Sequence, residues 1–116
     1  MRVLVCGGRD FVDSSVLWGC LDTLRREAKH DCMTVIQGGA RGADQMAREW
    51  CVSRKVPYEN YPADWTAHGK AAGPIRNQRM IDRGRPDRVL AFTGGKGTTD
   101  MVARANRAGV PVELVK

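Results

Sequence analysis

Four glycine-bearing turns constrain this chain more than any other feature, because each stands where an expected strand gives way to an expected helix. They span residues 6–10, 37–44, 72–77 and 93–100, and three of them follow a short apolar run. Glycine lets the backbone turn tightly, adopt a positive φ and approach a ligand closely. A helix that begins after such a turn presents unpaired N–H groups and a partial positive charge, which suit a phosphate group. Several such turns in so small a chain indicate one shared anion site.

Strand and helix patterns alternate along the whole sequence. The expected strands are the short apolar runs at 2–6, 33–36, 58–61, 88–92 and 112–115. Apolar residues at helical spacing predict helices between them. This alternation favours parallel strands joined by right-handed crossovers. We therefore expect a single domain over residues 1–116 with an α/β fold, a three-layer α/β/α Rossmann-like sandwich around a mostly parallel five-stranded sheet.

The order of the strands decides where a ligand would bind. In an order of 3-2-1-4-5, the order reverses between the first and fourth strands, and ligands of open α/β sheets bind at such a point, beyond the carboxyl ends of the strands. The turns after the first and fourth strands would then face one crevice. The turn after the second strand would lie beside it.

Local signals set the expected bounds of three segments. Residues 62–69 are expected to form a loop, and a helix is expected to follow Pro74, since proline is tolerated in a first helical turn. Thr98 or Thr99 is expected to open the next helix as its cap. Gly109 is expected to end that helix.

The composition limits the class of protein and the kind of partner. The chain has 116 residues, a net charge of +6 and 28% charged residues, which suits a small globular domain with a polyanionic partner. No apolar stretch approaches the roughly 20 residues of a membrane span, and no signal-peptide pattern is visible, so we expect a cytoplasmic protein. The four cysteines lack C-x-x-C spacing and are expected to be small buried thiols, with no metal site.

Charged side chains within the turns are the main candidates for ligand contacts. Arg41 suits a two-pronged contact with a phosphate. Asp44, at the head of a helix, either accepts from ribose hydroxyls or stabilises the helix N-terminus. Arg76 and Asn77 stand on the first turn of the helix after Pro74, and Arg76 is either a ligand contact or a surface arginine.

The loop before that helix carries two further candidates, Asp64 and Trp65. Trp65 either stacks on a base or packs in the core or in a lid. The expected ligand contacts are Gly7, Gly8, Arg9, Gly38, Gly39, Arg41, Gly42, Asp44, Asp64, Trp65, Arg76, Asn77, Gly94, Gly95, Lys96, Gly97, Thr98 and Thr99.

These loops together resemble the Smf/DprA/LOG (SLOG) superfamily of Rossmann-like nucleotide-binding proteins, and within it the small stand-alone YspA-like proteins. The matching segments follow the expected order over nearly the whole chain; they are 7–11, 38–44, 61–65, 69–77 and 94–100. The resemblance implies a nucleotide or nucleotide-derived ligand and a homo-oligomer of two or more copies. We expect no cofactor.

LOG-type members of the superfamily are phosphoribohydrolases that cleave the N-glycosidic bond of nucleoside 5′-monophosphates. Their signature is P-G-G-x-G-T-x-x-E with an arginine upstream, for which Arg76 would stand here. Thr93 replaces the proline, and Met101 occupies the glutamate position. Asp100, the nearest carboxylate, comes one residue earlier, which is about 100° of rotation on a helix. In this alternative Arg76 and Asp100 are the catalytic residues: Arg76 neutralises charge, and Asp100 steadies the ribosyl cation or orients water.

Three functions agree with these features. The first is a sensor or sponge that binds a nucleoside monophosphate, ADP-ribose or an NAD-related molecule, supported by the glycine turns with Arg41, Arg76 and Lys96. The second is the LOG-like hydrolase. The third is DprA-like binding of single-stranded DNA, which the positive charge favours, although 6% aromatic residues supply no stacking track along a strand.

Overall fold

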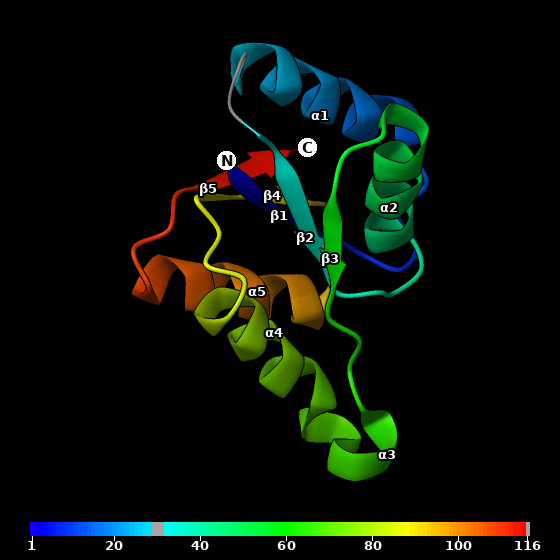
Figure 1. Cartoon of the computed structure of the whole chain (residues 1–116). Helices are drawn as coiled ribbons and strands as arrows, with labels where there is room; N and C mark the ends of the chain where they lie inside the picture. Colours follow the sequence, from blue (N-terminus) through cyan, green and yellow to red (C-terminus); the bar gives the residue numbers. More distant parts are fainter. Residues whose placement is uncertain (29–31, 116) are drawn as a thin grey trace.

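The computed structural model describes residues 1–28 and 32–115, and strands and helices alternate through them as expected (Figure 1). The strands are β1 (Arg2–Cys6), β2 (Thr34–Gln37), β3 (Tyr58–Asn60), β4 (Arg88–Phe92) and β5 (Val112–Val115). The helices are α1 (Ser14–Ala28), α2 (Ala43–Arg54), the short α3 (Trp65–His68), the 3₁₀ turn η1 (Gly69–Ala71), α4 (Ala72–Asp82) and α5 (Lys96–Arg107). The predicted α/β fold is confirmed.

The five strands form one sheet in the order β3-β2-β1-β4-β5, and every pair is parallel. This is the 3-2-1-4-5 order considered from the sequence. Each crossover helix returns the chain to the same edge of the sheet, so all five carboxyl ends lie together. The order reverses between β1 and β4, and the loops that follow these two strands flank one crevice.

The sheet is covered on both faces, as its continuous apolar strands require. Figure 1 shows α1 and α2 on one side of the sheet and α4 and α5 on the other. Along β1, Val3 and Val5 pack in the core beneath α1 and α2, whereas Leu4 and Cys6 pack in the core beneath α4 and α5. No helix in the described part of the chain is both long and apolar enough to cross a membrane.

The segment before α4 differs from the expected loop. Residues 65–68 form the helical turn α3 because the Asp64 side chain caps it, with Oδ1 accepting a hydrogen bond from the Ala67 N–H at 3.0 Å. Helix α4 then begins at Ala72, two residues before Pro74. The missing N–H of Pro74 costs nothing there, because the N–H groups of a first turn have no partner within the helix.

The start of α5 also differs from the expectation. The helix begins at Lys96 with Gly95 as its N-cap, and Gly95 offers no side-chain oxygen. Thr98 and Thr99 therefore lie inside the first turn instead of capping it. Gly109, with a φ of +76°, follows the end of α5 as expected.

The cysteines only partly match the expectation of buried thiols. All four are free; Cys6 and Cys51 are buried, Cys20 is half-buried and Cys32 is exposed. Cys32 is exposed because it lies on the connection between α1 and β2, outside both helical layers.

Candidate functional site

A cleft of about 1000 Å³ opens at the crevice between β1 and β4. Its walls come from the loops after β1, β2 and β4 and from the segment that runs from α3 into α4. Its volume is at the upper end of the range typical of small-molecule sites. We call this cavity the main cleft, and it has room for a ligand of nucleotide size.

Glycines let three of these loops approach so closely that their backbones form hydrogen bonds with one another. The Gly8 N–H donates to the Thr93 carbonyl oxygen at 2.9 Å, and the Ala43 N–H donates to the Gly8 carbonyl oxygen at 3.3 Å. Gly42 has a φ of +80°, and a Cβ on it would strike the Gly8 carbonyl oxygen. A Cβ on Gly94 would stand 2.6 Å from the Gly8 nitrogen. Glycine is therefore required at 42 and 94 for the loops to meet.

Asp44, the second residue of α2, brings a buried carboxylate to the main cleft. Only 7% of the residue is exposed, and this burial raises its pKa from 3.8 to about 6. Backbone N–H groups of Ala40 and Gly38 and the cations of Arg76 and Arg9 oppose the shift without cancelling it. The Ala40 N–H donates to Oδ2 at 3.2 Å. A buried carboxylate with a displaced pKa in a cleft is typical of a functional site.

Arg76 reaches from α4 to the loop after β2. Its Nη1 donates to the Gly38 carbonyl oxygen at 2.7 Å, and its Nε donates to Asn77 Oδ1 at 3.0 Å. The guanidinium and the Asp44 carboxylate both crowd the place where a Gly38 Cβ would stand, so position 38 has no room for a side chain. Burial lowers the pKa of Arg76, and Asp44 opposes that shift. Because a guanidinium has five N–H donors, Arg76 keeps donors for a ligand.

Asp100 lines the same cleft, but neighbouring side chains hold its carboxylate. Its Oδ2 accepts from Asn77 Nδ2 at 2.9 Å and from Arg104 Nε at 2.8 Å. Burial opposes ionisation of Asp100, but these two hydrogen bonds and the charges of Arg104 and Arg107 together outweigh it, and the pKa lies below its usual value. Asn77 also donates to the Gly97 carbonyl oxygen at 3.1 Å, which ties α4 to the first turn of α5.

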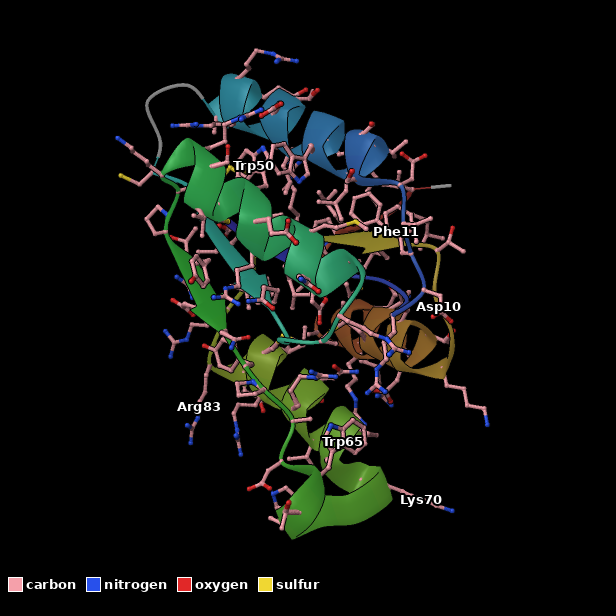
Figure 2. All side chains as sticks on the ribbon, turned by 90° about the vertical axis from the view of Figure 1, so that its right-hand side faces the viewer. Asp10, Phe11, Trp50, Trp65, Lys70 and Arg83 are labelled. Carbon is pink, nitrogen blue, oxygen red and sulfur yellow. The ribbon has the colours of Figure 1, made fainter. Side chains whose placement is uncertain are left out.

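A cation–π contact between distant loops stands at the mouth of the cleft. The Arg9 guanidinium carbon lies 5.4 Å from the centroid of the Trp65 ring, within the range of an attractive contact. In Figure 2, Trp65 turns back toward the body of the molecule, while Lys70 of the same projecting segment points outward. The contact links the loop after β1 to α3.

A second cavity of about 350 Å³ adjoins the main cleft. We call it the side compartment; it is lined by Arg9, Gly38, Gly39, Ala40, Arg41, Pro62, Ala63, Trp65 and Arg76. Arg9, Ala40, Trp65 and Arg76 also line the main cleft. The two cavities are therefore neighbours, and we call them together the continuous site.

Comparison with known sequences agrees with the loops described above. The sequence pattern of the "YspA, cpYpsA-related SLOG family" matches residues 1–68, which run from β1 through α3. The chain belongs to this family. It is also 40% identical over 119 aligned residues to the Gene 61 protein of Mycobacterium phage D29, an alignment that covers 96% of this chain and 93% of that protein. Arg76 and the loop after β4 lie beyond the residues that match the family pattern.

Most ligand contacts predicted for this SLOG-family chain lie in the continuous site. Those in the main cleft are Gly7, Gly8, Arg9, Asp44, Trp65, Arg76, Asn77, Gly94, Gly95, Lys96, Gly97 and Thr98. Asp100, the candidate catalytic carboxylate, lines the same cleft. The side compartment adds Gly38, Gly39 and Arg41. Their roles in binding remain predictions.

Three predicted contacts lie outside the lining of both cavities. Gly42 serves the close approach of two loops, and Asp64 caps α3. The Thr99 hydroxyl donates to the Gly95 carbonyl oxygen at 3.2 Å. Each of these three residues has a local structural role, and the sequence pattern alone did not distinguish that role from ligand binding.

Other residues of this SLOG-family chain line the site without having been predicted. Asp10, Phe11 and Asp13 continue the loop after β1 into the main cleft, and their position directly after the first glycine turn was the available signal. Cys6 ends β1 at the cleft; burial raises its pKa to about 12, and Asp44 adds to the shift. The thiol therefore stays protonated and is no nucleophile at neutral pH.

Gln37, at the end of β2, supports the loop after β2 without lining either cavity. Its side chain is fully buried, and its Oε1 accepts from the Gly39 N–H at 2.5 Å, which holds the loop after β2. Its Nε2 has no hydrogen-bond partner among the described residues. A polar residue at the end of an apolar strand was the signal for it in the sequence.

Proposed function

We propose that the continuous site binds a nucleotide or nucleotide-derived ligand, such as a nucleoside monophosphate, ADP-ribose or an NAD-related molecule. One observation carries the proposal: three glycine loops converge on a cleft that contains the buried carboxylate of Asp44 and the half-buried guanidinium of Arg76. Glycine loops let backbone N–H groups approach a phosphate. Arginine adds charged donors, and a carboxylate accepts from ribose hydroxyls. SLOG-family membership is consistent with this class of ligand.

In this proposal binding is the activity itself. A chain that holds its ligand without turnover serves as a sensor, through a change in its own partners, or as a sponge that lowers the free ligand concentration. Both roles require only the site and no catalytic step.

A second candidate function is N-glycosidic hydrolysis of a nucleoside monophosphate. The observation that favours it is that the main cleft holds two carboxylates whose surroundings move their pKa values apart. Burial raises the pKa of Asp44 to about 6, whereas the pKa of Asp100 is lowered despite its burial. Such divergence is typical of a proton donor paired with an ionised group that stabilises positive charge. In this alternative Asp44 donates the proton, and Asp100 steadies the ribosyl cation.

The test is a calorimetric titration of AMP, ADP-ribose and NAD into the unmodified chain and into Arg76→Ala. We expect at least one of the three to bind, and Arg76→Ala to lower its affinity about tenfold or more, since a charged hydrogen bond contributes about 1.5–3 kcal/mol. Arg79→Ala is the matched control: Arg79 is exposed on the same helix, and it lines a groove outside the site. Far-UV circular dichroism checks that both variants fold.

Turnover separates the two candidates. Free base released from AMP and detected by chromatography supports the hydrolase. A ligand that raises the melting temperature without product supports binding alone; at 100 times its Kd, it adds about 2.7 kcal/mol of stability. Failure of all three ligands to bind, or equal binding by Arg76→Ala and the unmodified chain, contradicts the proposed site.

A further inference from the structure

The two cavities of the site differ in charge. Four basic side chains and four aspartates line the main cleft, so their formal charges cancel. The side compartment is lined by Arg9, Arg41 and Arg76, and among the described residues no acidic side chain lines it. The lining of the side compartment therefore has a net positive charge, and two of its three arginines, Arg9 and Arg76, also face the main cleft.

The three arginines come from three separate elements. Arg9 lies in the loop after β1, Arg41 in the loop after β2, and Arg76 on α4. Like charges brought to one small cavity repel one another. The charge of Asp44, which lines the main cleft, acts on both Arg9 and Arg76 and offsets part of this repulsion. Asp10 meets Arg41 only at 3.9 Å, with both side chains largely exposed.

Two of these guanidiniums are held in place before any ligand arrives. Arg76 is fixed by the Gly38 carbonyl oxygen, and Arg9 rests on the Trp65 ring. A long side chain loses rotamer freedom when it is immobilised by a ligand, so a prior contact lowers the cost of binding. Trp65 is therefore a positioning residue for Arg9, and the guanidinium already occupies one face of its ring.

We infer that the side compartment is a phosphoryl subsite, in which Arg9, Arg41 and Arg76 hold a phosphate group of the ligand while the remainder lies in the main cleft. The inference rests on the proposed function and deepens it. Arginine forks match the geometry of phosphate oxygens. A phosphate held instead by the Gly94–Thr98 turn would lie in the main cleft, where the formal charges of the lining side chains cancel.

The test uses inorganic phosphate as the probe, titrated by ³¹P NMR at constant ionic strength maintained with chloride. We expect Arg9→Ala and Arg41→Ala each to weaken phosphate binding about three- to tenfold. The control is Arg48→Ala, which removes the same charge from an exposed position on α2 and should bind as the unmodified chain does. Arg9 and Arg41 are also exposed, so both variants should fold.

Three outcomes overturn the inference. The first is that Arg9→Ala and Arg41→Ala bind phosphate as well as Arg48→Ala does. The second is that the unmodified chain does not bind phosphate. The third is that Lys96→Ala weakens phosphate binding more than either arginine variant, which places the phosphate at the turn before α5. Trp65→Phe should bind phosphate as tightly as the unmodified chain does. Trp65→Leu should weaken phosphate binding as much as Arg9→Ala does, since only an aromatic face holds the Arg9 guanidinium.

The same variants titrated with AMP separate this inference from the proposed function. If AMP binds the unmodified chain and both arginine variants equally, the nucleotide site stands and the phosphoryl subsite is overturned. If phosphate binding weakens as expected but AMP, ADP-ribose and NAD do not bind, the subsite stands and the nucleotide proposal fails.

Discussion

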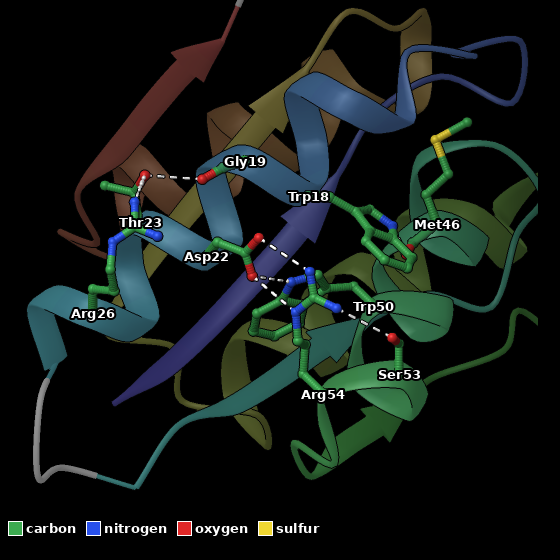
Figure 3. Close-up of polar contacts among 9 residues, drawn as sticks. All are labelled: Trp18, Gly19, Asp22, Thr23, Arg26, Met46, Trp50, Ser53 and Arg54. Carbon is green, nitrogen blue, oxygen red and sulfur yellow. Dashed lines mark hydrogen bonds and ion pairs between the residues drawn. The ribbon is translucent and has the colours of Figure 1, made fainter.

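Two regions of this molecule contain the same kinds of residue, aspartate, arginine and tryptophan, in different arrangements. One lies between α1 and α2 and comprises Trp18, Asp22, Trp50 and Arg54 (Figure 3). The other is the site at the carboxyl edge of the sheet, with Arg9, Asp44, Trp65 and Arg76. We call the first the helix-layer cluster.

In the helix-layer cluster the polar groups satisfy one another. Asp22 accepts from Trp50 Nε1 at 2.8 Å and from Arg54 Nε at 3.1 Å. These hydrogen bonds lower the pKa of Asp22. The Arg54 guanidinium also lies 5.1 Å from the Trp18 ring centroid. Such a closed set of contacts fastens one helix to another and leaves few donors for a ligand.

In the site Arg9 rests on the Trp65 ring in a similar way, but Asp44 and Arg76 do not form an ion pair. Among the described residues no ion pair joins Asp44 to an arginine, and Arg76 is held by a backbone carbonyl instead. Asp44 is buried, and its pKa is raised to about 6. Both regions have the same residue types, so a candidate binding site is distinguished from a structural contact by N–H donors that remain available and by a carboxylate without an ion pair.

The largest expected effect on stability comes from replacing a tryptophan by alanine, which can be done once in each region. Trp50 is fully buried and Trp65 is 50% exposed. We expect Trp50→Ala to lower the free energy of unfolding by about 3–5 kcal/mol, because it leaves a cavity in the core. Trp65→Ala should cost less than about 1 kcal/mol. Urea denaturation measures both, and equal losses would show that α3 supports the fold as much as α2 does.

The pH dependence of stability should have opposite signs for Asp44 in the site and Asp22 in the helix-layer cluster. Asp44 has a raised pKa, so the folded state binds its proton more tightly, and stability falls as the pH rises from about 4 to about 6. Asp44→Asn should remove that fall and, at pH 7, stabilise the fold by up to about 3 kcal/mol. Denaturant unfolding at a series of pH values checks this. A variant with the same pH profile as the unmodified chain would mean that Asp44 is not the titrating group.

Glycine substitutions should affect the site and the helix-layer cluster differently. A Cβ on Gly38 would collide with the Arg76 guanidinium, whereas nothing lies within 4 Å of a Cβ on Gly19 in α1. We expect Gly38→Ala to displace Arg76 and weaken the binding of AMP, or of whichever nucleotide binds, about tenfold, or about 1.4 kcal/mol. Gly19→Ala should leave affinity unchanged and stabilise α1 slightly. Calorimetric titration of both variants separates a local collision from a general effect of the added methyl group.

The smallest expected effect is at Asp22. Its lowered pKa means that the ionised carboxylate stabilises the fold above the unfolded pKa of 3.8 and that this contribution disappears as the pH falls through the folded pKa. Asp22→Asn should therefore cost up to about 1 kcal/mol at neutral pH, since the pair with Arg54 is partly exposed. The same denaturation series detects it. A loss larger than that of Trp50→Ala would reverse the ranking of packing over pairing in this region.

Much of the fold was predictable because its signals are local. Alternation of apolar runs with helical periodicity depends on residues a few positions apart, and it placed all five strands within one or two residues of their observed bounds. Helix starts were less predictable. α4 and α5 begin before Pro74 and Thr98, because a first turn accepts proline and a glycine N-cap as well as the expected residues.

The site was predictable only as a meeting of loops. Strand order brings the turns after β1, β2 and β4 together, and the structure has that order. The side-chain contacts within it were not predictable. The Arg76 guanidinium reaches Gly38, which is 38 residues away in the chain, and no local pattern indicates such a contact. The α3 turn, which brings Trp65 over Arg9, was expected as a loop.

The alternation of strands and helices, the glycine positions where loops approach one another and the family of the chain could all be predicted from the order of its residues. The burial of Asp44 without an ion pair, the pairing of Asp22 and the meeting of three arginines in one small cavity became visible only in the folded molecule. Propensity and periodicity act over a few residues, whereas burial, pKa and charge balance depend on which distant side chains the packed helices and loops bring within a few ångströms.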